Sequence, residues 1–255
     1  MPMSMPAIEP VLRAPPNDWS AFCIASVIAE SGDAIPLYAK IYHVHPYLQA
    51  IIDAIFPVRE DVAAARSLDE ATLARAFHPR LAREAWIVAL FPYRDADVRA
   101  FVRATKFYGE TTVLPVVGQI SAEYLLETLE EKRRMSGWDV PLLVPMPLSP
   151  RRERERGYNQ VARFAEAMLP HLEGAVSYAP RALDREHRES QVRKKHASRA
   201  DNIYGAFFVP DRASIAERQV ILLDDVVESG ATMKDARRAL TAAGVTDVLG
   251  IAIAH

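Results

Sequence analysis

The sequence has very little cysteine: Cys23 is the single one among 255 residues. An internal disulfide framework and a CxxC zinc ribbon are therefore both excluded, and a reducing compartment fits. No apolar run reaches the roughly 18 residues that a transmembrane helix needs. No basic stretch followed by an apolar one opens the chain, so no signal peptide is expected. These absences together predict a cytoplasmic protein without zinc.

Excess charge of one sign is also missing. The 31 basic and 33 acidic residues leave a formal net charge of −2. This balance excludes a protein that coats nucleic acid through bulk positive charge but permits a local basic patch. With 50% hydrophobic and 25% charged residues, the composition is that of a soluble globular protein with at least one sizeable core.

The first half of the chain shows helical patterning. Residues 1–18 hold five prolines and little apolar bulk, which predicts a disordered arm. Apolar residues then recur at helical spacing in 19–28, 47–56 and 116–134. They do so again in 98–107, where Gly109 is suited to end the helix. We expect residues 19–136 to form an N-terminal helical segment.

After Gly137, short apolar runs alternate with helical stretches. We predict strands at 141–146, 176–178, 206–209, 220–223 and 247–254, and helices at 160–169 and 232–243. Such alternation is typical of βαβ units around a parallel sheet. The expected fold class is therefore α/β, with residues 137–255 forming a parallel-sheet core.

One segment, residues 220–232, carries clear chemical content. An apolar strand ends in Asp224 and Asp225, and a loop with Ser229, Gly230 and Thr232 leads into a helix. Ligands of parallel sheets bind at the carboxyl ends of strands, and N–H groups at a helix start favour a phosphate. The carboxylates would repel phosphate but suit neighbouring hydroxyls, or a Mg²⁺ carried on a polyphosphate. This pattern describes a site for a ribose 5-phosphate.

Residues 220–232 resemble the phosphoribosyl-pyrophosphate (PRPP) signature of type I phosphoribosyltransferases. The resemblance implies that Asp224 and Asp225 hold the ribose hydroxyls and that the loop from Glu228 to Thr232 wraps the 5-phosphate. Mg²⁺ would arrive with PRPP near the two acids, and the chain would supply no direct metal ligand. The binding residues predicted in this way are Asp224, Asp225, Val226, Val227, Glu228, Ser229, Gly230, Ala231 and Thr232, with Met146 and Pro147 at a second strand end.

Two of these positions leave alternatives open. Glu228 stands where some purine-type members of the family carry an acid close to the transferred base. It is therefore either a catalytic general base or a solvated loop carboxylate. Met146 and Pro147 follow the strand at 141–146, where the family binds pyrophosphate. Because an X–Pro bond reaches cis at low cost, this is either a cis pyrophosphate turn or a plain proline turn.

Three further blocks narrow the resemblance. They lie in residues 93–109, 145–160 and 191–207, and include KFYG at 106–109 and NIYG at 202–205. With the PRPP signature they resemble the ComF family, the competence-associated branch of phosphoribosyltransferase-like proteins. Many ComF-type proteins begin with a cysteine-rich zinc ribbon, which one cysteine cannot build. His43 and His45 show no ligand spacing that would compensate.

The ComF resemblance implies PRPP binding and a part in DNA uptake during natural competence, with single-stranded DNA and the uptake machinery as partners. Two other functions stay open. One is an active phosphoribosyltransferase that moves phosphoribose from PRPP to a nitrogen nucleophile in nucleotide metabolism. The other is a non-catalytic regulator that senses PRPP.

Two basic segments flank the predicted site. Residues 151–156 hold four arginines, and residues 181–199 hold seven basic and three acidic residues. The second lies where the family has a flexible hood over PRPP. It is a cationic clamp for pyrophosphate, a track for single-stranded nucleic acid or a solvated loop. Few aromatic residues lie nearby, only Tyr158 and Tyr204, which weakens the nucleic-acid interpretation. We place Lys106 toward the anion site as a hypothesis.

Overall fold

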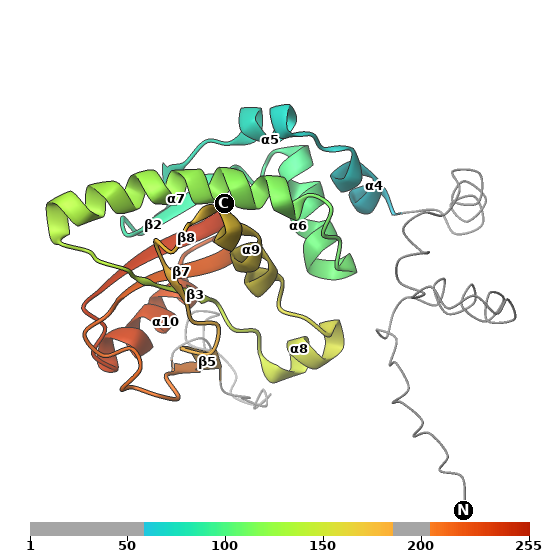
Figure 1. Ribbon diagram of the computed structural model, residues 1–255. Coiled ribbons are helices and arrows are strands. Elements are labelled where there is room, and N and C mark those ends of the chain that lie inside the picture. Colours follow the sequence, from blue (N-terminus) through green and yellow to red (C-terminus); the bar gives the residue numbers. More distant parts are fainter. Residues whose placement is uncertain (1–58, 186–204) are drawn as a thin grey trace, which may run out of the picture. The chain divides into compact units, whose positions relative to one another are not determined.

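The computed structural model describes residues 59–185 and 205–255 (Figure 1). The predicted arm at 1–18, the helices at 19–28 and 47–56, and the histidines 43 and 45 lie outside these ranges. So does most of the basic segment at 181–199. The described residues form one compact unit with a single central sheet.

The central sheet has six strands in the order β1-β2-β8-β7-β3-β4. β1 pairs antiparallel with β2, and every other neighbouring pair is parallel. A separate antiparallel pair, β5 with β6, lies outside this sheet. The α/β prediction with a mostly parallel sheet is therefore confirmed. The strands are β1 (Arg80–Leu81), β2 (Ile87–Phe91), β3 (Leu142–Pro145), β4 (Ser177–Tyr178), β5 (Asp184–Arg185), β6 (Phe207–Phe208), β7 (Gln219–Val226) and β8 (Asp247–Ala254).

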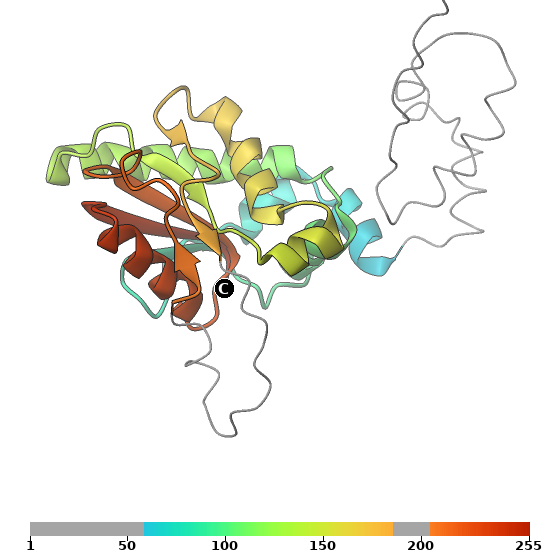
Figure 2. The same ribbon diagram turned by 90° about the horizontal axis from the view of Figure 1, so that it is seen from below.

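Helices cover both faces of the sheet, so its inner strands are apolar on both sides. All five residues of β2 are buried, as are seven of the eight in β8. Figure 2 shows α7 and α10 on opposite faces. The helices are α4 (Glu60–Ser67), α5 (Glu70–Ala76), α6 (Ala96–Tyr108), α7 (Leu114–Ser136), α8 (Pro150–Arg156), α9 (Gln160–Met168) and α10 (Ala231–Ala242), with a short 3₁₀ turn, η1 (Leu169–His171).

One predicted helix end, at Gly109, is confirmed by its cap, and a second helix ends in the same way at Gly137. Gly109 ends α6 with a φ of 69°, and Gly137 ends α7 with a φ of 65°. Both values lie in the left-handed region that glycine adopts without a steric penalty. Within the described residues, no helix is both long enough and apolar enough to cross a bilayer.

Two boundaries differ from the sequence prediction. The segment predicted as helical, 19–136, also contains β1 and β2, and β2 pairs with β8 inside the sheet. The sheet therefore draws on residues on both sides of the predicted boundary at 137. In addition, β7 does not stop at Leu223 but continues to Val226, because its pairing with β8 extends to Ala254.

Candidate functional site

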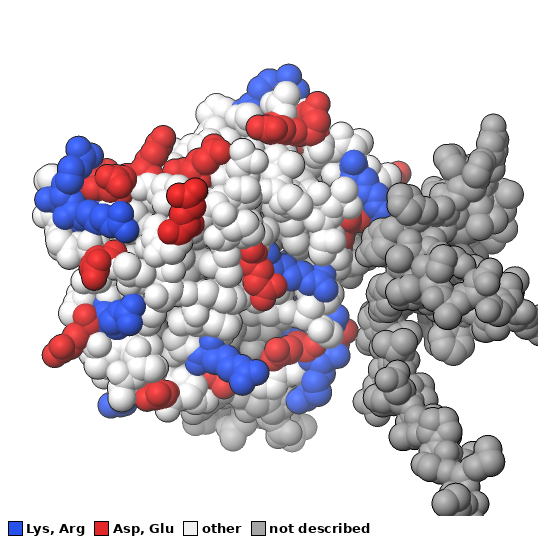
Figure 3. All heavy atoms as spheres, viewed as in Figure 1, with Lys and Arg blue, Asp and Glu red and all other residues white. Residues whose placement is uncertain are grey.

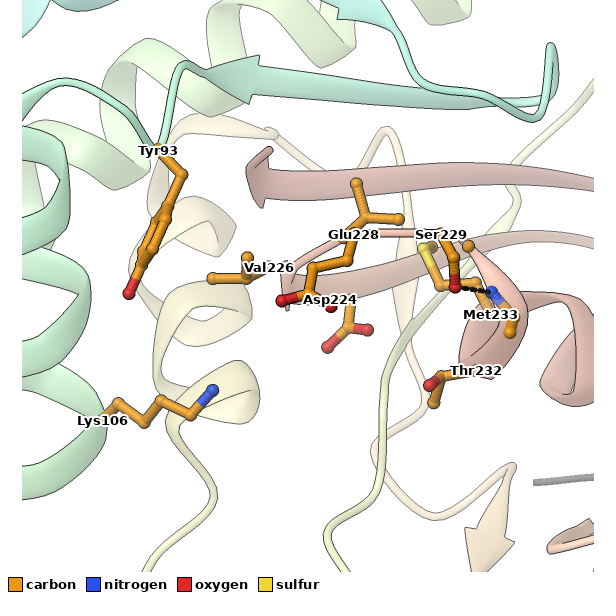
Figure 4. Close-up of a pocket in the computed structure, with 11 residues that line it drawn as sticks. Tyr93, Lys106, Asp224, Val226, Glu228, Ser229, Thr232 and Met233 are labelled. Atoms are coloured by element: carbon orange, nitrogen blue, oxygen red, sulfur yellow. Dashed lines mark hydrogen bonds between the residues drawn. The ribbon is translucent and has the colours of Figure 1, made fainter. Parts of the chain in front are cut away.

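The carboxyl ends of the parallel strands meet at one edge of the sheet. A cavity of about 450 Å³ opens there, beside the end of β7 and between α6 and the start of α10 (Figure 4). This edge is where open α/β sheets bind their ligands. Most of the predicted loop lies on its wall. The lining residues are Tyr93, Lys106, Asp224, Val226, Val227, Glu228, Ser229, Gly230, Ala231, Thr232 and Met233.

The N-terminus of α10 forms one end of the cavity. Gly230 is the N-cap, with a φ of 75°, and no side-chain hydrogen bond caps the helix. The Ala231 N–H makes only a long bond, 3.4 Å, to Ser229 Oγ. The first N–H groups of α10 are therefore available to an anion, whose charge the helix dipole favours.

The β1–β2 turn supports this loop from outside the cavity. A Cβ built on Gly230 would lie 3.2 Å from Glu84 Cγ and 3.3 Å from Ile87 Cδ1. Glu84 also pairs with Lys234 of α10, with 3.2 Å between Oε1 and Nζ. The backbone angle of Gly230 favours glycine, and a side chain there would also press against Glu84 and Ile87.

Asp224 is partly exposed and lines the middle of the cavity wall. Its Oδ1 accepts a hydrogen bond of 2.9 Å from the Asp225 N–H. Removal from water raises the pKa of the Asp224 carboxyl well above its ordinary value, and the negative charge of Asp225 adds to the shift. A cation or a set of hydroxyl donors would relieve both effects, so Asp224 is suited to hold such groups.

Asp225 lies in different surroundings from its neighbour. It is 6% exposed and is absent from the cavity wall. Its Oδ2 lies 3.1 Å from Lys106 Nζ and accepts a bond of 2.9 Å from Gln160 Nε2. The sequence predicts the same role for both acids. In the structure, Asp224 lines the cavity, whereas the carboxylate of Asp225 contacts α6 and α9.

Lys106 and Tyr93 form the end of the cavity opposite α10, as Figure 4 shows. Lys106 comes from the last turn of α6, and Tyr93 follows the end of β2. Lys106 thus lines the same cavity as the predicted loop, and its role toward an anion stays a prediction. Tyr93 was not predicted as a site residue, since only the pairing of β2 with β8 brings it to this edge.

Met146 and Pro147 do not line the cavity, contrary to their predicted place in the site. Met146 is 3% exposed; its N–H donates to Leu223 O at 2.8 Å, and its carbonyl accepts from Asn159 Nδ2 at 3.0 Å. Both backbone hydrogen-bonding groups of Met146 are thus already occupied. The bond before Pro147 is trans, so the cis alternative was wrong.

The basic side chains near the site gather from two elements. The arginines of α8 are exposed except Arg156, which is partly buried. Burial lowers the pKa of Arg156 and of Arg185, and the positive charge of Arg152 adds to both shifts. Arg152 therefore lies within electrostatic reach of both Arg156 and Arg185. On the face in Figure 3, by contrast, acidic and basic side chains are interspersed.

The residues of the cavity fit a Mg²⁺ that arrives on a polyphosphate. Asp224 offers carboxylate oxygens, the ligands that Mg²⁺ prefers, and no basic side chain of the described residues forms an ion pair with it. Within the same residues, no cluster of three or more His, Cys, Asp or Glu could hold a metal by itself. A single carboxylate suits an ion whose other ligands come from the bound molecule and water.

The chain is similar to known proteins in sequence and in structure. No protein-family model matches it. Similar solved structures include a hypoxanthine phosphoribosyltransferase from Staphylococcus aureus, 15% identical over 55% of this chain and 61% of that one, with a TM-score of 0.33. Another is the hypoxanthine phosphoribosyltransferase from Trypanosoma cruzi, 11% identical over 55% of this chain and 65% of that one, with a TM-score of 0.37.

Two curated relatives carry the same name. The competence protein ComFC of Streptococcus pneumoniae is 28% identical over 160 residues, 63% of this chain and 64% of that protein. The competence protein ComFC of Bacillus subtilis is 36% identical over 103 residues, 40% of this chain and 39% of that protein. The match thus spans less than two thirds of either relative. Over about three fifths of its length, the chain is similar in sequence to the ComFC competence protein of Streptococcus pneumoniae.

Proposed function

We propose that the cavity binds PRPP together with Mg²⁺, and that the protein serves DNA uptake as a ComFC-like protein. One observation carries the ligand assignment: in a single cavity, Asp224 stands between the N-terminus of α10, which no side chain caps, and Lys106 (Figure 4). The 5-phosphate would accept hydrogen bonds from the free N–H groups of α10. Asp224 would accept hydrogen bonds from the ribose hydroxyls, and Mg²⁺ beside it would neutralise the charge of the pyrophosphate.

The test is a calorimetric titration of PRPP with Mg²⁺ into the full chain and into Asp224→Asn. The exposed Asp139→Asn is the matched control, because it makes the same chemical change away from the cavity. We expect saturable binding in the wild type and in the control, and a loss of at least tenfold in affinity in Asp224→Asn, the size of one charged hydrogen bond. Equal affinity in all three proteins, or no binding by the wild type, would overturn the proposal.

Phosphoribosyl transfer is a second candidate function, favoured by Glu228. This residue is exposed on the cavity wall and close in sequence to Asp224, so its carboxylate can take a proton from a nitrogen nucleophile. The bond from the anomeric carbon to pyrophosphate would break as the bond to nitrogen forms. Pyrophosphate release that needs both a nucleobase and Glu228 would establish an enzyme. PRPP binding without release would instead favour a non-catalytic sensor.

Single-stranded DNA is the partner that we propose for the surface at the end of α6. Phe107 and Tyr108 are 54% and 38% exposed. Arg156 lies 5.4 Å from the centre of the Phe107 ring, and Arg59 lies 4.9 Å from that of Tyr108. Exposed rings beside cations suit bases and phosphates of a single strand. Tyr158, named from the sequence, is less suited, since Arg163 covers its ring and its hydroxyl donates to Thr105 O.

A further inference from the structure

Both carboxylate oxygens of Asp225 are engaged by the protein itself. Oδ1 accepts a bond of 2.8 Å from the Val226 N–H. Oδ2 accepts from Gln160 Nε2 at 2.9 Å and lies 3.1 Å from Lys106 Nζ. With the residue 6% exposed, no carboxylate oxygen is presented to the cavity in the way that Asp224 presents its own.

The contact between Asp225 and Gln160 is fixed from the far side. Gln160 is 2% exposed, and its Oε1 accepts a bond of 2.8 Å from Arg156. Because the amide oxygen faces Arg156, the amide nitrogen must face Asp225. Asn159 caps α9 at the residue before, with bonds to Val161 N and Ala162 N, which sets the backbone of this turn. The carboxylate of Asp225 is therefore held rigidly toward α6.

Lys106 is the group that this rigid carboxylate orients. A lysine has a flexible four-carbon stem and loses much rotamer freedom when it is fixed. Its side chain is 27% exposed, and it lines the cavity while its ammonium is paired with Asp225. The contact places the Lys106 ammonium at the end of the cavity opposite α10, and the ammonium in turn neutralises the charge of Asp225.

We propose that Asp225 is a positioning residue for Lys106, and that Lys106 contacts a second anionic group of the ligand. This inference rests on the proposed function of the same cavity. One anion would lie at the N-terminus of α10 and the other at Lys106, with Asp224 between them. The ligand class is therefore a sugar phosphate that carries a further anionic group, and a sugar with one phosphate would engage the α10 end alone.

The test compares two ligands, and it compares the effect of Asp225→Asn with and without Lys106. PRPP with Mg²⁺ and ribose 5-phosphate are titrated into the wild type, Lys106→Met, Asp225→Asn, the double variant and Asp224→Asn. We expect Lys106→Met to lower the affinity for PRPP roughly 10- to 100-fold, which corresponds to the loss of one charged hydrogen bond. The affinity for ribose 5-phosphate should not change. Asp225→Asn should lower the affinity for PRPP but not the affinity for ribose 5-phosphate. When Lys106 is already methionine, Asp225→Asn should change the affinity for PRPP by no more than about twofold.

Other results of these titrations would overturn the inference. Asp225→Asn could lower the affinity for both ligands, or lower the affinity for PRPP by the same factor with and without Lys106. Either result would mean that Asp225 binds the ligand directly, and the inference would be overturned. It is also overturned if Lys106→Met leaves PRPP affinity unchanged. Melting curves for each variant would separate a loss of folding from a loss of binding.

A second measurement is independent of PRPP. Acetic anhydride labels free lysines, and mass spectrometry gives the rate at Lys106 relative to Lys234, which is paired with Glu84. We expect Asp225→Asn to speed labelling of Lys106 several-fold and to leave Lys234 unchanged. If the wild type binds neither ligand, the proposed function fails, while this rate still decides the positioning role. An unchanged Lys106 rate would overturn it.

Discussion

Asp224 and Asp225 are neighbours in the chain, yet their carboxylates enter opposite environments. Successive residues of a strand point to opposite faces, and β7 continues through both acids to Val226. One carboxylate lines the cavity and forms no ion pair with a described residue, and the other is enclosed by a lysine and a glutamine. The same chemical group therefore lines the cavity at one position and contacts side chains of α6 and α9 at the next.

Asp224→Asn should raise stability at alkaline pH. The folded pKa of this acid is raised by burial and by Asp225. Between its ordinary and its raised pKa, the unfolded chain gives up the proton first, so native stability falls as pH rises. We expect the melting temperature of the variant to exceed that of the wild type more at pH 8 than at pH 4.5. A variant that melts lower at pH 8 would contradict the assignment.

Asp235→Asn should destabilise the protein. The carboxylate is 2% exposed and accepts from Gly205 N, Ala206 N and Arg238 at 2.8–2.9 Å. Burial alone would raise the pKa of Asp235, but these donors outweigh it and the pKa is lowered. Urea unfolding should show a loss of about 1.5–3 kcal/mol near neutral pH. Because a lowered acid pKa stabilises only above the ordinary value, the difference should shrink below about pH 4.

The exposed Asp139→Asn serves as the control for that change, since the substitution is the same and the site is open to water. We expect its unfolding free energy to stay within about 0.5 kcal/mol of the wild type. A similar loss in both variants would mean that the Asp235 contacts contribute little.

Gly118→Ala should disturb the packing of α7 on α9. A Cβ at this position would lie 2.4 Å from the carbonyl oxygen of Ala167, so one helix must move. We expect a loss of about 1–3 kcal/mol, as in other overpacked cores, although alanine favours helices. The matched control is Ser121→Ala on the same helix. The buried Ser121 hydroxyl has no hydrogen-bond partner in the described residues, so its removal should leave urea stability equal or higher.

Phe107→Ala should weaken single-stranded DNA binding. Loss of one stacking ring is worth about 1–3 kcal/mol per base, and fluorescence anisotropy with a labelled oligonucleotide would measure it. PRPP affinity should not change, because Phe107 does not line the cavity. Leu81→Ala removes a 64% exposed apolar side chain from β1 and should leave DNA binding intact. If the two variants lose DNA affinity equally, the α6 surface is not the DNA site.

Local signals in the sequence predicted the elements that carry them. The apolar run before Asp224, the glycine before α10 and the glycine after α6 each specify a strand, a turn or a helix end, and each lies where expected. β2 has no such signal. Its five apolar residues, 87–91, fit a buried strand or a buried helix equally well, and only pairing with β8 decides between them.

The candidate site was predicted in part for the same reason. Its loop is contiguous in sequence, so residues 226–232 could be assigned together. The direction of Asp225 depends on three more residues of pairing in β7, which no local pattern reports. The contact of Asp225 with Lys106 joins positions far apart in the chain, and a sequence alone does not show such pairs.

The position of β8 in the sheet has a consequence for synthesis on the ribosome. β8 is the last strand along the described chain, and it is the strand that joins β1-β2 to β7-β3-β4. Until it has left the exit tunnel, the nascent chain holds two unjoined strand groups whose open edges can pair with other chains. The cavity, which needs Tyr93 from one group and Asp224 from the other, exists only after translation has passed residue 254.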